Sequence, residues 1–251
     1  MNHLKTRIFP FTIHQRLSIA LFSLAITLSA SAVPTNYSVK REVSVTAMAS
    51  SASATSVGAS QHNLRDLIKE MPDSILPLLT HSSRLDLLDY AASGMTARVK
   101  GVTGEPCQLI SITDRYMSLE ESSSTRVEML LLEQKLLNKQ LICFIRTYLN
   151  PMPESEVSFY SSDWQPLRAA RYLATPRPTD FLILPTGETL AERQQALSST
   201  GVPMISAQVR ASGNQLVWHI CLDEGFTDIK ERLKPYLKDE IIMQWDGNRF
   251  K

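Results

Sequence analysis

The segment "QLVWHICLD" holds a histidine and a cysteine that could act as a base and a nucleophile. His219 and Cys221 are two residues apart, so on a β-strand their side chains point to the same face. Catalysis needs a hydrogen bond between imidazole and thiol, and this spacing on a strand does not form it. The pair is also short of the three or four ligands that zinc needs. We therefore interpret the segment as a half-buried strand.

Acidic residues gather in the segments "PESE" and "DEGFTDIKE", as Glu154, Glu156, Asp223, Glu224, Asp228 and Glu231. A calcium loop needs alternating oxygen donors and a glycine at its sixth position, and Gly225 does not meet that register. Paired carboxylates can cleave glycosidic bonds, so a hydrolase with acids from residues 154–163 or 223–228 is the alternative function. We favour loop solvation for these acids. The sequence predicts no catalytic residue, no metal site and no cofactor.

The first 62 residues predict export. Residues 1–16 contain three basic residues and no acid, and the apolar run "LSIALFSLAITLSASA" ends with Ala30 and Ala32 at the −3 and −1 positions of a cleavage site. This pattern predicts a signal peptide over residues 1–32, with an uncleaved anchor as the alternative. Residues 33–62 are rich in Ser, Ala, Thr and Val. They offer little apolar surface to offset the entropy of ordering, so we expect a flexible tether.

The charge balance disfavours a nucleic-acid partner. The whole chain has 26 Lys+Arg and 25 Asp+Glu. Removal of residues 1–32 takes three basic and no acidic residues, which leaves 23 against 25 and a net charge of −2. A nearly neutral chain offers no basic stripe for a phosphate backbone. Contact with a membrane is predicted only through the export signal.

Three cysteines remain after the predicted cleavage: Cys107, Cys143 and Cys221. Secreted proteins that depend on disulfides usually have more cysteines, in even number. Cys143 and Cys221 lie within apolar strand-like runs, where a free thiol acts as a small hydrophobic group. We favour core packing for both, and a Cys143–Cys221 bridge is the alternative.

Helical spacing of apolar residues follows the tether. Asn63 is a suitable N-cap for "LRDLIKEM". The segment "PDSILPLL" predicts a short helix that Pro77 bends or ends. A further helix is predicted in "SSRLDLLDYAAS", with Ser82 or Ser83 as its cap and Gly94 as its stop.

The apolar period then changes to two. The segments "CQLISIT", "YMSLEES", "RVEMLLLEQ" and "KQLICFIRTYL" are separated by turn residues and predict an antiparallel meander. The order recurs loosely: Thr189 and Glu192 fit a capping box, and further strands follow. The sequence predicts an α+β fold of antiparallel sheets covered on one face by helices. We place its two parts at residues 63–175 and 176–251, with the second packed on the first, and a tandem helix-then-meander repeat is one interpretation.

Two tryptophans lie at the ends of predicted strands. Trp164 and Trp245 each precede a turn. Such rings can close the edge of a core, or they can anchor a partner, because aromatic residues dominate binding hot spots. We favour the core edge as the more common case. If the chain is a binding protein, we predict an interaction patch of Trp164, Trp245 and Tyr160 beside an exposed sheet face.

Four segments, in this order, resemble an uncharacterised family of secreted Bacteroidales proteins, a domain of unknown function: "MPDSILPLLTHSSRLDLLDYAASGM", "ITDRYMSLEES", "ICFIRTYLNPMPESEVSFYSSDWQPL" and "PTDFL". The resemblance runs from about Leu64 to the C-terminus and brings no established catalytic residue. It implies an exported protein of a Gram-negative bacterium, in the periplasm or at the outer membrane and soluble after signal cleavage.

These features together favour a non-catalytic protein that binds a protein, a peptide or a glycan of the bacterial envelope. A buried carboxylate with a raised pKa in a deep cleft would instead favour the hydrolase. A structural envelope subunit is the third hypothesis, and a long exposed edge strand would support it.

Overall fold

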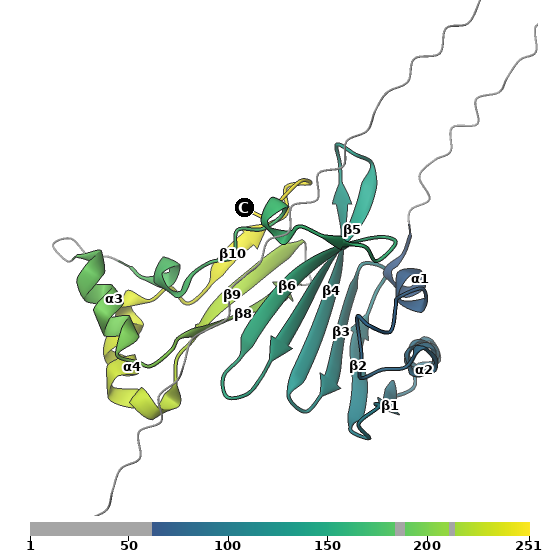
Figure 1. Cartoon of the computed structure of the whole chain (residues 1–251), viewed down its shortest axis with the longest axis horizontal. Helices are drawn as coiled ribbons and strands as arrows, with labels where there is room; N and C mark the ends of the chain where they lie inside the picture. The colour runs from purple at the N-terminus through teal and green to yellow at the C-terminus, as the bar shows by residue number, and fades with distance from the viewer. Residues whose placement is uncertain (1–61, 184–188, 211–213) are drawn as a thin grey trace, which may run out of the picture. The chain divides into compact units, whose positions relative to one another are not determined.

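Seven strands form one large antiparallel sheet in the computed structural model, which describes residues 62–183, 189–210 and 214–251 (Figure 1). Each strand pairs with the next one along the chain, so the predicted meander is confirmed. The strands are β1 (Arg98–Lys100), β2 (Pro106–Ile112), β3 (Tyr116–Ser122), β4 (Thr125–Gln134), β5 (Lys139–Tyr148), β6 (Glu154–Ser161) and β7 (Pro166–Leu167).

The central strands β4 and β5 are buried on both faces of this sheet. Every residue from Val127 to Leu132 in β4 is buried, and so is every residue from Leu141 to Ile145 in β5. A strand with one face in water alternates apolar and polar residues, whereas a strand covered on two faces is apolar throughout. The runs "VEMLLL" and "LICFI" therefore indicate a layer on each side of the sheet.

Two helices cover one face, α1 (Leu64–Lys69) and α2 (His81–Ala92) (Figure 1). Asn63 caps α1, as predicted, because its side chain accepts a hydrogen bond from the Asp66 amide at 2.9 Å. The cap of α2 is Thr80, which accepts from the Ser83 amide. The prediction of Ser82 or Ser83 as the cap was wrong by two or three residues, since α2 begins at His81.

The segment between the two helices forms turns, so the predicted helix in "PDSILPLL" is wrong. Pro77 has no amide hydrogen to donate, and eight residues are too few to sustain a helix that a proline interrupts. Gly94 ends the second helical segment as predicted, with a positive φ of 70°. That backbone conformation suits glycine because glycine has no Cβ to clash.

The first hydrophobic core lies between these helices and the large sheet. It contains Leu64, Leu67, Ile68, Leu87 and Leu88 from the helices. The sheet contributes inward-facing residues from β2 to β5, among them Leu109, Leu119, Met129, Leu131 and Phe144. The apolar stripe of the helices is thus a packing surface for the sheet.

The C-terminal part of the chain contributes a smaller sheet. Its order is β10-β9-β8, and both pairs are antiparallel. The elements of this part are η1 (Ala169–Arg171), η2 (Pro178–Phe181), α3 (Leu190–Ser198), β8 (Met204–Arg210), β9 (Gln215–Cys221), η3 (Glu224–Phe226), α4 (Thr227–Leu233), η4 (Lys234–Tyr236) and β10 (Ile241–Gln244). The predicted capping box of α3 is confirmed, with reciprocal bonds between Thr189 and Glu192. Because α4 separates β9 from β10, this part only loosely repeats the order of the first.

A second core joins the two sheets. Leu130, Leu132, Cys143 and Phe159 from the large sheet pack with residues of the small one, such as Trp218. The helices therefore cover one face of the large sheet and the small sheet covers the other. The predicted class, α+β with antiparallel sheets, is confirmed.

The predicted signal peptide at 1–32, and all of the predicted tether at 33–62 except His62, lie outside the described residues. The described residues all belong to one compact unit, residues 55–251. Among them, no helix has the length and apolar character needed to cross a membrane. The predicted boundary between 63–175 and 176–251 stays a prediction.

Candidate functional site

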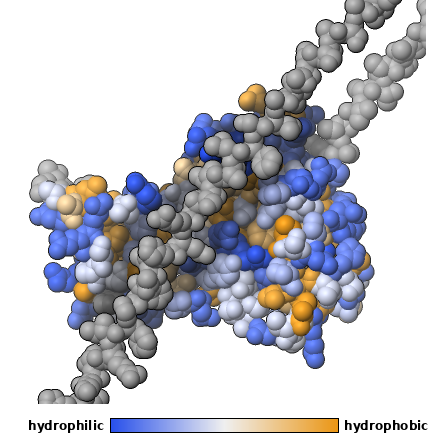
Figure 2. Space-filling view, viewed as in Figure 1, coloured by the Kyte–Doolittle hydropathy of each residue, from blue (hydrophilic) through white to orange (hydrophobic). Residues whose placement is uncertain are grey.

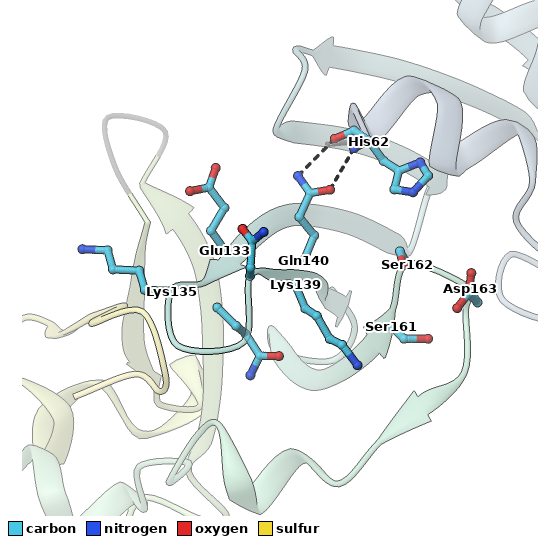
Figure 3. Close-up of a pocket in the computed structure, with 10 residues that line it drawn as sticks. His62, Glu133, Lys135, Lys139, Gln140, Ser161, Ser162 and Asp163 are labelled. Carbon is cyan, nitrogen blue, oxygen red and sulfur yellow. Dashed lines mark hydrogen bonds between the residues drawn. The ribbon is translucent and has the colours of Figure 1, made fainter. Parts of the chain in front are cut away.

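An open polar pocket of about 330 Å³ lies at one end of the large sheet (Figure 3). The hairpin between β4 and β5 supplies most of its wall: Glu133, Gln134, Lys135, Asn138, Lys139 and Gln140. The remaining lining comes from His62, just before α1, and from Ser161, Ser162 and Asp163 at the end of β6. Segments far apart in the sequence therefore meet at this pocket.

Gln140 fixes the start of the described chain to the hairpin. Its Oε1 accepts a hydrogen bond from the His62 amide at 2.9 Å, and its Nε2 donates to the His62 carbonyl oxygen at 3.1 Å (Figure 3). Two bonds between one amide side chain and one backbone residue restrict both partners. This pairing therefore holds one wall of the pocket in place.

Gln134 brings a buried donor without a partner to the pocket. The residue is 6% exposed, and its Nε2 is buried with no hydrogen-bond partner. An unsatisfied buried amide costs about 1–3 kcal/mol, so such groups in a native protein need an explanation, for example a bound ligand. Because this nitrogen is itself buried, it can contact a ligand only when the side chain turns toward the open pocket, and on that basis we treat it as a candidate ligand contact.

Lys139 and Ser161 lie on the same face of the sheet as Gln134. Gln134 pairs with Lys139 across the hairpin, and Leu141 pairs with Ser161. Residues paired across strands share a face, as do residues two apart on one strand. Figure 3 shows the Lys139 side chain extending toward Ser161, whereas Glu133 and Lys135 point away. An ammonium, an amide and a hydroxyl thus gather at one place.

This set of groups suits a polar ligand with both donors and acceptors. Lys139 and the Gln134 amide nitrogen can donate, Asp163 can accept, and the hydroxyls of Ser161 and Ser162 can do both. The Ser161 hydroxyl already accepts from the Gln165 amide at 3.1 Å, which orients it. The volume lies at the lower end of the range of about 300–1,000 Å³ that is usual for small-ligand sites.

A second hollow, of about 430 Å³, lies near the other ends of β5 and β9. Its walls include the loop 151–153, Cys221, Lys230 and Glu224. Although this hollow is larger, none of the described residues that line it holds a buried polar atom without a partner. We therefore place the candidate site at the pocket that contains Gln134.

The aromatic residues of the predicted patch lie mostly within the two cores. Trp164 is 4% exposed on the helix side and donates from Nε1 to the Leu67 carbonyl at 2.8 Å. Trp245 is 6% exposed in the core between the sheets. Tyr160 is half-buried and lies beside Trp164, with ring centroids 5.9 Å apart and ring planes tilted by 52°. The three rings do not form one exposed patch, and their burial agrees with the core-edge interpretation.

His219 and Cys221 lie on the same strand, β9, and have different side-chain neighbours. The Nε2 atom of His219 lies 3.1 Å from the side-chain nitrogen of Gln208. The Cys221 thiol lies 3.5 Å from the Ser206 hydroxyl. Cys143 is buried in the second core, and all three cysteines are free thiols. Cys143 is thus a packing group, as the sequence favoured, whereas Cys221 is half-buried and lines the second hollow.

The acids of the predicted hydrolase alternative are spread over the molecule. Glu154 and Glu156 are exposed on β6, Asp163 lines the first pocket, and Glu224 lines the second hollow. Among the described residues, no three His, Cys, Asp or Glu side chains gather in a metal-binding arrangement. The structure does not bring the two acidic regions together in one pocket.

Two buried carboxyls have raised pKa values, and each lies within a packed layer. Burial raises the pKa of Glu121, although Arg146, whose Nε is 3.4 Å from the carboxylate, opposes the rise. Burial also raises the pKa of Glu128, against hydrogen bonds from the Tyr116 hydroxyl at 2.6 Å and the Val209 amide at 3.4 Å. Glu121 lies under the turns that precede α2, and Glu128 lies between the sheets.

No motif in the sequence marks Gln134, Lys139 or His62 as a site residue. Polar residues at the end of a hairpin usually interact with solvent, and the segment "EQKLLNKQ" has the composition of such a turn. The sequence does contain Asn138, a residue typical of turns, between two segments predicted to be strands. The structure confirms a turn there, since the φ of Asn138 is 47°. This turn places Gln134 and Lys139 near one another but does not bring His62 or Ser161 to them.

Residues 56–250 match the protein family described as "Protein of unknown function (DUF3256)". The structure is similar to one described as "Structure of a domain of an uncharacterized protein from Porphyromonas gingivalis W83", with a TM-score of 0.63 and 22% sequence identity. The similarity covers 76% of this chain and 97% of that one, and it shows a shared fold. No curated protein matches the sequence significantly.

Proposed function

The chain belongs to the family of proteins of unknown function DUF3256, and we propose that it is an exported, non-catalytic binding protein of the bacterial envelope. Its ligand site is the pocket between the β4–β5 hairpin and the end of β6. Of the ligand classes that suit an envelope protein, namely proteins, peptides and glycans, a hydroxyl-rich glycan segment best matches the mixed donors and acceptors of this pocket.

The observation that carries this proposal is the buried Gln134 amide without a partner. When the side chain turns toward the open pocket, a ligand oxygen can accept from this amide and remove the cost of the unmade hydrogen bond. The nearby groups then bind different parts of the ligand. Lys139 favours a hydrogen-bond acceptor or an anionic group, and Asp163 favours a hydroxyl donor. Pairing of Gln140 with His62 pre-forms one wall, which lowers the entropy cost of binding.

The location of the charged groups supports binding over hydrolysis. A glycosidase needs one protonated and one ionised carboxyl, about 5–9.5 Å apart and on either side of the scissile bond. The described carboxyls with raised pKa values, Glu121 and Glu128, lie inside packed layers. Export is supported by the predicted signal peptide, which precedes the described residues.

Titration calorimetry with short oligosaccharides that contain uronic and N-acetylated sugars tests this function. Replacing Gln134 with Leu keeps the side-chain volume but removes the amide, and we expect affinity to fall about ten-fold, as for the loss of one well-placed hydrogen bond. The matched control is Gln208→Leu on β8, outside the pocket, which we expect to bind like the wild type.

Three results would contradict this proposal. Equal affinity of the wild type and Gln134→Leu for the oligosaccharide would show that Gln134 does not contact the ligand and that the site lies elsewhere. Binding of acidic peptides in place of oligosaccharides would change the ligand class. Release of shortened oligosaccharides during the titration would favour the hydrolase. Circular dichroism of each variant shows whether a loss of binding reflects a loss of fold.

A further inference from the structure

Two neighbouring leucines are exposed at the tip of the β4–β5 hairpin. Leu136 is 87% exposed and Leu137 is 53% exposed. Figure 1 shows this hairpin projecting beyond the rest of the large sheet. The face drawn in Figure 2 carries scattered hydrophobic residues among mostly hydrophilic and neutral ones. Single exposed leucines are common in soluble proteins, but an adjacent pair at a projecting tip presents its apolar surface outward.

Basic residues flank the two leucines on both sides. Lys135 and Lys139 are exposed, and neither has an ion-pair partner among the described residues. Two nearby acids are already paired: Glu133 with Arg115 at 3.6 Å, and Asp246 with Lys251 at 2.6 Å. Asp163 lies below the tip, in the pocket wall. The tip is therefore apolar and positively charged.

The hairpin is braced from its base, so the tip is held in one orientation. The Lys135 amide donates to the Gly247 carbonyl at 3.2 Å, and the Trp245 indole donates to the Glu133 carbonyl at 2.9 Å. The Lys135 stem lies against Gly247, where an added Cβ would approach it to 3.0 Å. Asn138 takes the left-handed conformation that closes the turn. Because the tip is already ordered, binding through the leucines costs little conformational entropy.

We propose that this tip, Lys135–Lys139, inserts its two leucines into the headgroup region of an anionic lipid bilayer. Apolar side chains flanked by lysines are suited to a membrane interface: the leucines enter the acyl boundary and the ammonium groups stay with lipid phosphates. Two leucines and two lysines give weak, reversible and salt-sensitive binding. Lys139 extends toward Ser161 in the free protein (Figure 3), so it would have to turn toward the tip to reach a lipid phosphate. The pocket would then face the membrane surface from the base of the same hairpin.

Vesicle co-sedimentation of the exported protein, purified after its own signal processing, tests this inference. The probes are vesicles of phosphatidylethanolamine with phosphatidylglycerol at 3:1, and vesicles of phosphatidylcholine. We expect the wild type to bind the anionic vesicles, and the bound fraction to fall at least five-fold in Leu136→Ser/Leu137→Ser. Lys135→Gln/Lys139→Gln should remove the preference for anionic vesicles, and added salt should do the same.

Matched controls separate this surface from other exposed apolar residues and from the pocket. Val102→Ser changes a side chain that is 65% exposed outside the hairpin, and it should bind vesicles like the wild type. Gln134→Leu, which weakens oligosaccharide binding under the proposed function, should also leave vesicle binding unchanged. Leu136→Trp should give a blue-shifted emission on anionic vesicles that Val102→Trp does not give.

Two outcomes would overturn the inference. One is equal binding of anionic vesicles by the wild type and the double leucine variant, or no binding by either. The other is the loss of a cross-linked envelope protein in the leucine variant without any change in vesicle binding, which would make the tip a protein-docking surface. Neither outcome depends on whether the pocket binds oligosaccharides.

Discussion

Arg84 is a buried cation that connects the turns before α2 to the helix itself. The residue is 2% exposed, and its guanidinium donates to the carbonyl oxygens of Met71 at 2.6 Å and Leu79 at 3.2 Å. It also pairs with Asp73 at 2.7 Å, whose side chain is 66% exposed. One planar group therefore satisfies backbone acceptors that neither a helix nor a strand could reach.

Replacing Arg84 with Met should lower the free energy of unfolding by about 2–4 kcal/mol, because two buried carbonyls lose their donor. Asp73→Asn is the control, and because Asp73 is largely exposed its loss of charge should cost at most about 1 kcal/mol. Urea denaturation followed by tryptophan fluorescence measures both. A loss in Arg84→Met no larger than that in Asp73→Asn would show that the carbonyls find other partners.

For single residues, the sequence predicts the hydrogen bonds that form between residues close together in the chain. The Asn63 cap and the box of Thr189 with Glu192 involve residues three apart, so composition and spacing are sufficient. The acceptors of Arg84 lie 5 and 13 residues away and depend on the path of the intervening turns. No local rule places a buried arginine there.

Among the elements, β8 is an edge strand that lies against the face of the large sheet. Its outward amides are accepted by side chains: Ala207 donates to the Ser155 hydroxyl at 2.8 Å, and Val209 donates to Glu128 at 3.4 Å. Thr147 lies 2.7 Å from the Ser155 hydroxyl and supports it. Buried amides of an edge strand need such acceptors, and this arrangement joins the two sheets.

Glu128→Gln should alter the dependence of stability on pH. Burial raises the pKa of Glu128 above its ordinary value of 4.5, so the folded state holds this proton more tightly than the unfolded state does. Its contribution to stability is therefore complete below about pH 4.5 and is lost as the pH rises through the raised pKa. The glutamine variant lacks this loss, and its unfolding free energy at pH 7 should equal or exceed that of the wild type.

Glu128→Leu provides the control for the acceptor role of this side chain. It leaves the Tyr116 hydroxyl and the Val209 amide without an acceptor, and we expect a loss of about 2–4 kcal/mol at pH 7. Thermal unfolding of the three proteins from pH 4.5 to 8 distinguishes the two effects. A Glu128→Gln protein whose stability falls with pH as steeply as that of the wild type would exclude Glu128 as the titrating group.

Element identity was predictable because the period of apolar residues changes cleanly after Gly94. The segments "CQLISIT", "YMSLEES" and "QLVWHICLD" became β2, β3 and β9, and the segments with continuous apolar runs, "RVEMLLLEQ" and "KQLICFIRTYL", became the doubly covered strands β4 and β5. The exception was "PDSILPLL", where apolar spacing indicated a helix but the prolines and the need to reach Arg84 favour turns. Tertiary contacts decide such short segments.

For the molecule as a whole, both faces of the large sheet are covered, so the proposed site lies at one of its ends. The sequence suggested an exposed sheet face with strand-end aromatics, but the small sheet occupies that face and covers Trp245. The candidate pocket instead combines His62, the hairpin residues Gln134 and Lys139, and Ser161, from three places in the chain. Such a combination follows from the register of β4, β5 and β6, which sequence periodicity does not fix.

The most direct test of this account follows the side-chain amide of Gln134 by NMR during titration with the uronic-acid oligosaccharides. The signal is assigned by its absence in Gln134→Leu. We predict that this amide signal shifts in a saturable manner, together with the backbone amides of Lys139 and Ser161. A Gln134 signal that stays in place while residues of the second hollow, such as Cys221 and Lys230, respond would contradict the account.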